Sequence, residues 1–128
     1  MCKSNPMDYG DESVVDEVDC RPSPEQIKAG KPAIFWGLLA YFPRALAEVA
    51  KVSMFGSTKH GKPLQYKGFL SDAYPIEMFD DAIGRHLLAL AQEGEVNTAD
   101  GDVYHRAQIM WSAAAGLEKL LIEKDKEK

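Results

Sequence analysis

The sequence has few cysteines, no long apolar run and no basic excess, and each absence excludes a class of protein. Its two cysteines, Cys2 and Cys20, have no histidine or further cysteine at a zinc-ligand spacing, and a cytosolic protein keeps such thiols reduced. No apolar run reaches the roughly 18 residues of a membrane-spanning helix. The stretch after Met1 is acidic, unlike a secretory signal. We therefore expect a cytoplasmic protein that does not bind membranes.

The net charge of −5 is concentrated in one stretch of the 128 residues. Residues 1–20 hold six of the 20 acids and one of the 15 bases, which leaves fourteen of each in the remainder. A neutral body has no basic excess to neutralise a phosphate backbone, so a nucleic acid polymer is not an expected partner. A small phosphorylated ligand is compatible with this charge. We interpret residues 1–24 as a flexible acidic arm, 25–124 as one domain and 125–128 as a charged, frayed tail.

The spacing of apolar residues predicts three helices. They cover residues 43–55, 76–93 and 103–124, and Pro43, Gly56 and Gly94 mark their boundaries. Residues 33–42 are apolar but contain Gly37, and we expect an extended segment that packs on the core. Residues 56–75 hold three glycines and two prolines, which predicts a long loop with ligand contacts.

No strand alternation is visible in residues 43–124, so the predicted fold is all-α, a small helical bundle. Asp100-Gly101 marks a turn between the second and third helices. The third helix is apolar or small around much of its circumference, which is typical of a helix that also contacts a second subunit. We expect oligomerisation to complete the bundle.

The second helix begins with three carboxylates, Glu77, Asp80 and Asp81. Spacings of three and four residues place Glu77 beside both aspartates. Such oxygen ligands suit Mg²⁺ or Mn²⁺, which take one or two carboxylates together with substrate phosphates. The alternative is an ordinary acid-rich first turn that stabilises the helix dipole. Asp81 and Arg85, four residues apart, form at least a stabilising helical pair.

Other polar residues each have a structural and a functional interpretation. His86 lies among the apolar residues of the second helix, either as a hydrogen-bonded core histidine or as part of a site. On the first helix, Glu48 and Lys51 share a polar face with Arg44. This face is either a stripe of solvated charges or part of a site, in which Glu48 is a ligand and Lys51 contacts a phosphate. The third helix has a polar line that is an outward face or part of a site, formed by His105, Gln108 and Ser112.

Short motifs follow one another in a fixed order: Gly30-Lys31-Pro32, Leu46-Ala47-Glu48-Val49-Ala50-Lys51-Val52, Phe55-Gly56-Ser57-Thr58-Lys59-His60-Gly61, Gln65-Tyr66, Asp81-Ala82-Ile83-Gly84-Arg85-His86, Gly94-Glu95 and His105-Arg106-Ala107-Gln108. Together they resemble the MazG-like all-α nucleotide pyrophosphohydrolases, in the phage and bacterial branch of dATP/dGTP diphosphohydrolases (MazZ-type). The resemblance covers about residues 28–122. The chain departs from the family pattern at Gln108, where members carry a second histidine.

The resemblance implies that residues 25–124 form a catalytic domain. This domain would hydrolyse purine deoxynucleoside triphosphates, dATP and dGTP, to monophosphate and pyrophosphate and so tune the nucleotide pool, with Mg²⁺ or Mn²⁺ as cofactor. It also implies a homo-oligomer, a dimer or tetramer, in the host cytoplasm if the protein is phage-encoded. The alternative is a non-catalytic helical module that binds a nucleotide or another protein.

The resemblance and the residue chemistry together assign expected roles. The expected catalytic residues are Glu48, Asp81 and His86. The expected metal ligands are Glu48, Glu77, Asp80, Asp81 and Glu95, and the expected phosphate contacts are Lys31, Lys59 and Arg85. Trp36 and Tyr66 are the expected base-stacking residues, and the alternative for each is an aromatic residue of the core.

Overall fold

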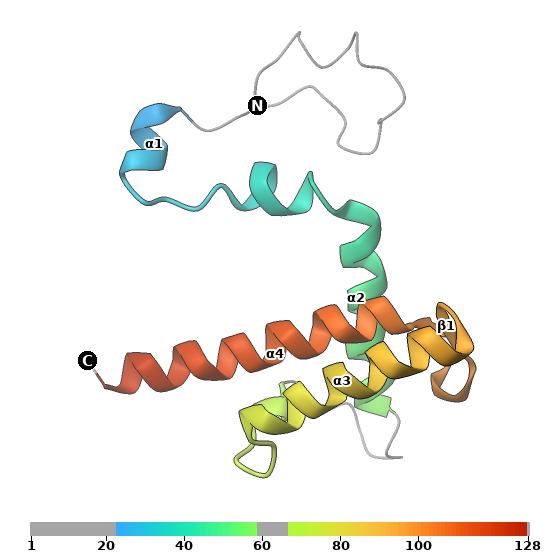
Figure 1. Cartoon of the computed structure of the whole chain (residues 1–128). Helices are drawn as coiled ribbons and strands as arrows, with labels where there is room; N and C mark the ends of the chain where they lie inside the picture. Colours follow the sequence, from blue (N-terminus) through green and yellow to red (C-terminus); the bar gives the residue numbers. More distant parts are fainter. Residues whose placement is uncertain (1–22, 59–66, 128) are drawn as a thin grey trace, which may run out of the picture. The chain divides into compact units, whose positions relative to one another are not determined.

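The computed structural model describes residues 23–58 and 67–127 (Figure 1). The chain divides into two units, Met1–Leu46 and Ala47–Lys128. The predicted acidic arm lies outside the described residues except for its last two positions, and so do Lys59 and Tyr66. Within the described ranges, no helix is both long and apolar enough to cross a membrane.

The first unit begins with a short helix that the sequence caps. In α1 (Pro24–Lys28) the Ser23 hydroxyl accepts a hydrogen bond from the Gln26 amide at 3.2 Å, and the Gln26 side chain accepts one from the Ser23 amide at 2.7 Å. This reciprocal pair is a capping box, which satisfies two amides that a helix leaves without partners.

The segment predicted to be extended over 33–42 is instead partly helical. Phe35–Leu39 forms a π-helix, η2, and the amide of Gly37 donates to the carbonyl of Ala33 at 2.7 Å. A single glycine costs a helix only about 1 kcal/mol, so Gly37 does not prevent the turn. The expected burial is also not observed, because Ile34, Phe35, Leu38 and Leu39 are each more than 40% exposed.

Two of the three predicted helices differ at their ends, and one is confirmed. α2 (Pro43–Thr58) continues past Gly56, where the prediction ended it, so the predicted loop is shorter. The loop also contains a 3-10 helix, η3 (Gly68–Leu70). α3 (Ile76–Glu93) has the predicted bounds, with Gly94 at φ 98° after it. α4 (His105–Lys126) starts two residues late and extends into the predicted tail.

A short hairpin joins α3 to α4, although the sequence predicted no strand here. β1 (Val96–Asn97) pairs antiparallel with β2 (Val103–Tyr104), and the 3-10 helix η4 (Thr98–Asp100) lies between them. Strands of two residues are too short to produce an alternating pattern. The predicted turn is confirmed, since Gly101 adopts the left-handed conformation with φ 71°.

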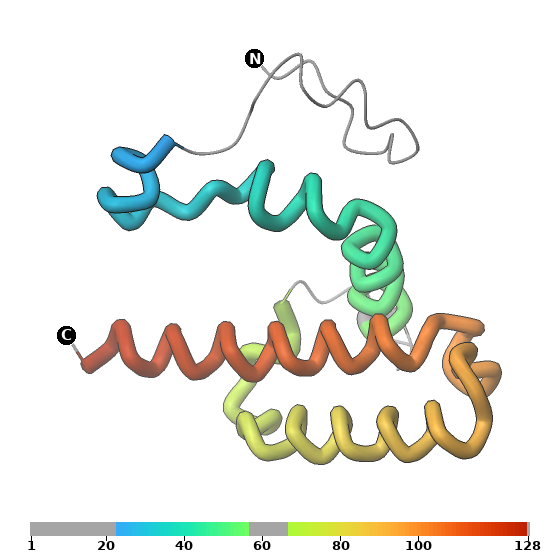
Figure 2. Tube along the Cα trace, turned by 45° about the horizontal axis from the view of Figure 1, so that its top comes forward, coloured from blue at the N-terminus to red at the C-terminus, as the bar shows by residue number. Residues whose placement is uncertain are grey.

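Within the second unit, α3 and α4 run antiparallel and lie side by side in both views (Figures 1 and 2). The predicted all-α class is therefore confirmed. The face of α4 that is buried carries mostly small or polar side chains: His105, Ala107, Gln108, Ser112, Ala115, Gly116 and Lys119.

An aromatic cluster links η3, α3 and α4. The rings of Phe69, Phe79 and Trp111 meet edge to face, with centroids 5.5–6.4 Å apart. Each such pair contributes about 0.5–1.5 kcal/mol beyond the area that it buries. The indole nitrogen of Trp111 also donates to the Ser53 hydroxyl at 2.7 Å, which ties α2 to α4.

Candidate functional site

The three carboxylates at the start of α3 are exposed to solvent. Glu77, Asp80 and Asp81 form no hydrogen bond or ion pair with other residues of the described ranges. Helical geometry places Glu77 and Asp81 on the side of α3 opposite the buried Phe79. Their oxygens are thus available to a ligand from solution.

The other predicted ligands have protein partners. Glu48 on α2 accepts a hydrogen bond from the Lys51 ammonium at 3.0 Å, and its side chain is 31% exposed. Both carboxylate oxygens of Glu95 accept from Nε of Arg106, at 3.0 and 3.3 Å.

Arg85, a predicted phosphate contact, is exposed on α3. It makes no ion pair with Asp81, so the stabilising helical pair expected between these two described residues is not formed. Its guanidinium is open to a ligand for that reason.

The predicted carboxylate ligands, all of which lie in the described part of the second unit, do not form a metal-binding cluster. In residues 23–58 and 67–127, no group of three His, Cys, Asp or Glu side chains is arranged to hold a metal ion. Lys31 is exposed and Trp36 is half-buried, and both belong to the first unit. The metal-ligand and base-stacking assignments stay predictions.

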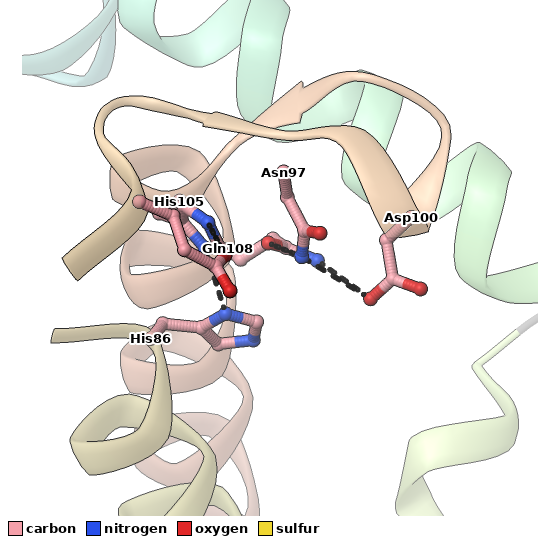
Figure 3. A network of polar contacts seen from close by, with 6 residues as sticks. His86, Asn97, Asp100, His105 and Gln108 are labelled. Carbon is pink, nitrogen blue, oxygen red and sulfur yellow. Dashed lines mark hydrogen bonds and ion pairs between the residues drawn. The ribbon is translucent and has the colours of Figure 1, made fainter. Parts of the chain in front are cut away.

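A pair of histidines lies where α3 and the start of α4 meet (Figure 3). Nδ1 of His86 is 3.3 Å from Nδ1 of His105, within hydrogen-bond distance, and the ring centroids are 5.5 Å apart. His86 is half-buried, whereas His105 is 1% exposed. His86 is therefore a hydrogen-bonded residue of the helix interface with part of its surface still accessible.

Beside the histidines, a second polar network joins the hairpin to α4 (Figure 3). The Asn97 amide donates to Oε1 of Gln108 at 2.9 Å and to the Asp100 carboxylate at 3.3 Å. The Gln108 amide donates to the same Asp100 oxygen at 3.5 Å. Asn97 and Gln108 are at least nine-tenths buried, so these bonds satisfy polar groups that water does not reach.

The polar line of the third helix faces inward. His105, Gln108 and Ser112 are all buried, which overturns the interpretation as an outward face. Of their partners, Asp100 was named from the sequence only as part of a turn, and Asn97 was not named. The spacing of the polar line was the available signal, but periodicity alone does not say which side of a helix a neighbour covers.

The described part of the second unit thus combines exposed carboxylates on α3 with a buried row of imidazole and amide groups under the hairpin. The carboxylates can bind a cation, and the ring and amide groups can orient a ligand or water by hydrogen bonds. These elements define the molecule as a small all-α domain built on an antiparallel helix pair.

Residues 23–128 match the family described as dATP/dGTP diphosphohydrolase, N-terminal. The match covers most of the 128 residues, and the chain belongs to this family. It also confirms the resemblance found from the sequence motifs. No curated protein and no solved structure matches the chain.

Proposed function

We propose that this protein hydrolyses purine deoxynucleoside triphosphates, dATP or dGTP, to the monophosphate and pyrophosphate, with Mg²⁺ or Mn²⁺ as cofactor. The observation that carries the proposal is the family match over residues 23–128. The exposed, unpaired carboxylates of α3 support it, because the reaction needs groups that hold a cation near the phosphates.

The residues present fit a divalent ion of this kind. Mg²⁺ is usually bound by one or two carboxylates and by substrate phosphates, rather than by a cage made of protein alone. Glu77 and Asp81 lie four residues apart on one side of α3, so this helix presents two carboxylates to an ion from solution. When bound, the ion polarises the phosphoryl group and activates water.

The charged side chains of the chain have complementary roles in this proposal. Asp81 and Glu48 are the main metal ligands, and Glu77, Asp80 and Glu95 are further carboxylates of the set. Arg85, with Lys31 and Lys59, neutralises phosphate oxygens. His86 orients a reacting group, and Trp36 and Tyr66 stack on the base.

We also propose that the enzyme works as a homo-oligomer, a dimer or tetramer, in the cytoplasm. Large apolar side chains on α4 support self-association, since Leu117 is 55% and Leu121 49% exposed. Exposed apolar surface of this kind is typical of a protein interface.

The deciding experiment measures pyrophosphate release from each of the four deoxynucleoside triphosphates. Each assay is run with Mg²⁺, with Mn²⁺ and with a chelator. We expect release from dATP or dGTP that the chelator abolishes. Nucleotide binding without release, in a folded sample, would instead support a non-catalytic nucleotide-binding module.

Two variants test the carboxylates. Asp81→Asn and Glu48→Gln each remove one negative charge with little change in shape, and we expect each to abolish turnover while circular dichroism stays helical. Glu118→Gln is the matched control, because Glu118 is exposed on α4 and has no role in the proposed reaction. This variant should leave turnover unchanged. Retained turnover in both site variants would contradict the assignment.

A further inference from the structure

The side of α4 that faces away from its packed side carries a row of apolar residues, which we call the outer stripe. Met110, Leu117 and Leu121 are 38%, 55% and 49% exposed, and Ala113 and Ala114 between them are also exposed. Spacings of three and four residues place all of them on one side of the helix. The solvent side of a surface helix normally carries polar residues, so the outer stripe predicts contact with another surface.

The outer stripe combines long and short side chains. The short side chains of Ala113 and Ala114 let the backbone of another helix come close, and a long side chain of that helix can pack over them. Leu117, one turn further along α4, is a side chain of the required length. A second copy of α4 therefore supplies both the short and the long residues that such a contact needs.

An antiparallel second copy brings these residues together in one register. In a two-fold pair each contact occurs twice, because residue i meets residue j and j meets i. The register that places Leu117 over the partner's Ala114 also places Met110 opposite the partner's Leu121. Both contacts are centred between residues 115 and 116, and the apolar contact extends along about 16 Å of each helix.

The same register pairs opposite charges at both ends of the outer stripe. Arg106 lies one turn before Met110 and Asp125 one turn after Leu121, so Arg106 falls opposite the partner's Asp125, and both residues are exposed. Among the described residues Arg106 bonds Glu95 through Nε, which leaves its two terminal nitrogens to donate to another carboxylate. Asp125 also has an interaction within its own chain, but a carboxylate accepts several hydrogen bonds.

A parallel pair of the same helices is less favourable. It would place Arg106 opposite Arg106 and Asp125 opposite Asp125, and like charges at a short distance repel each other. It would also set Leu117 against Leu117 and Ala114 against Ala114, so long side chains would meet each other while short ones left space unfilled. Charge and side-chain size thus both favour the antiparallel direction.

We propose that two copies of this chain associate through the outer stripes of α4, antiparallel and about a two-fold axis between residues 115 and 116, with Arg106 of each copy bound to the partner's Asp125. This pairing rests on the homo-oligomer proposed above and specifies its surface. The opposite side of α4 packs on α3, so the pairing leaves Glu77 and Asp81, on the far side of α3, open to solvent.

Cysteine cross-linking tests the direction of the two helices in the full chain, with Cys2 and Cys20 replaced by serine. We expect the variant with both Met110→Cys and Leu121→Cys to form a disulfide-linked dimer under mild oxidation. Met110→Cys alone should not cross-link, because its two copies lie about 16 Å apart along the helices, whereas a disulfide needs Cα atoms within about 7 Å. Cross-linking of Met110→Cys alone, or none in the double variant, would overturn the proposal.

Exchange of the paired charges gives a second measurement, by light scattering over a range of concentrations. Arg106→Glu sets two acids against each other at both ends of the outer stripe, and we expect the dissociation constant of the dimer to rise about 10-fold. Adding Asp125→Arg restores opposite charges in reversed order and should return the constant to near its original value.

The control for the charge exchange is Lys126→Glu. It makes the same change of charge at an exposed position of α4, on the side of the helix opposite Leu117, and should leave the dissociation constant unaltered. Equal weakening by Arg106→Glu and Lys126→Glu, or no recovery in the exchanged double variant, would show that Arg106 and Asp125 do not meet.

The proposals fail in different ways. A chain that is monomeric at all concentrations contradicts both the homo-oligomer and this pairing. An oligomer in which Met110→Cys cross-links alone leaves the homo-oligomer standing and overturns the antiparallel pairing. A lack of pyrophosphate release contradicts the hydrolase proposal and not the pairing, because mass and cross-linking are measured without a nucleotide.

Discussion

At the scale of single residues, Gly101 occupies a position with no room for a side chain. Its φ is 71°, and a Cβ there would lie 2.7 Å from the ring of Phe55. We expect Gly101→Ala to lower the free energy of unfolding by about 1–3 kcal/mol, because both the backbone and the ring must shift. Urea unfolding followed by tryptophan fluorescence measures this loss.

The control for this variant is Gly84→Ala on α3. Gly84 has no atom within 4 Å of the added Cβ, and alanine is the better helix former. Stability should rise by up to about 1 kcal/mol. Equal effects from the two glycine substitutions would show that contact with Phe55 does not matter.

The polar network under the hairpin gives a second prediction at this scale. Gln108→Leu leaves the Asn97 amide with Asp100 as its remaining acceptor. We expect it to lower the free energy of unfolding by about 1–3 kcal/mol. The double variant Asn97→Val with Gln108→Leu removes both amides, so its cost should be smaller than the sum of the single costs. Additive costs in this double-mutant cycle would contradict direct coupling of the two residues.

At the scale of elements, a buried lysine of α4 holds η3. The Lys119 ammonium donates to the carbonyls of Phe69 and Ser71 at 3.1 and 2.9 Å, and the residue is 8% exposed. Lys119→Met keeps the length of the side chain but leaves both carbonyls without this donor. We expect the free energy of unfolding to fall by about 1–3 kcal/mol and hydrogen exchange to become faster at the amides of residues 70 and 71.

Lys124→Met is the matched control for this loss. Lys124 is exposed in the last turn of the same helix, so its replacement should change stability by no more than about 0.5 kcal/mol. If both lysine variants lose the same amount, the effect belongs to the removal of a charge from α4 and not to the anchoring of η3.

An element was predicted correctly where residues within or next to it determine its structure, and incorrectly where contacts with other elements do. α3 was predicted with the correct bounds because Gly94 ends the helix through its own backbone preference and the proline-containing loop before it ends at Pro75. Gly56 misled the prediction because one glycine only weakens a helix, and α2 continues past it. The hairpin was missed because two-residue strands depend on each other and on α4, not on local pattern.

The candidate site was predicted less well than the helices for a similar reason. The carboxylates of α3 lie within five consecutive residues, so helical spacing alone placed Glu77 beside Asp81. The contact between His86 and His105 joins residues nineteen positions apart. It forms only when α3 and α4 pack, and no spacing within either helix encodes it.

At the scale of the whole molecule, α4 presents apolar side chains on the side away from its packed face. Gln108, Ser112 and Ala115 are buried, whereas Leu117 and Leu121, which helical geometry places on the other side, are about half exposed. Light scattering on the full chain should therefore give the mass of a dimer or tetramer. A monomer at all concentrations would contradict the proposed oligomer.

The variant Leu117→Ser tests whether this side of α4 is used. An interface leucine replaced by a small polar residue loses apolar contact in every copy, so we expect the measured mass to fall toward that of one chain. Leu87→Ser makes the same change at a 52% exposed position on α3 and should leave the mass unaltered. Because Leu117 is already 55% exposed within the chain, its loss should cost the single chain little stability, and circular dichroism on the same samples separates dissociation from unfolding.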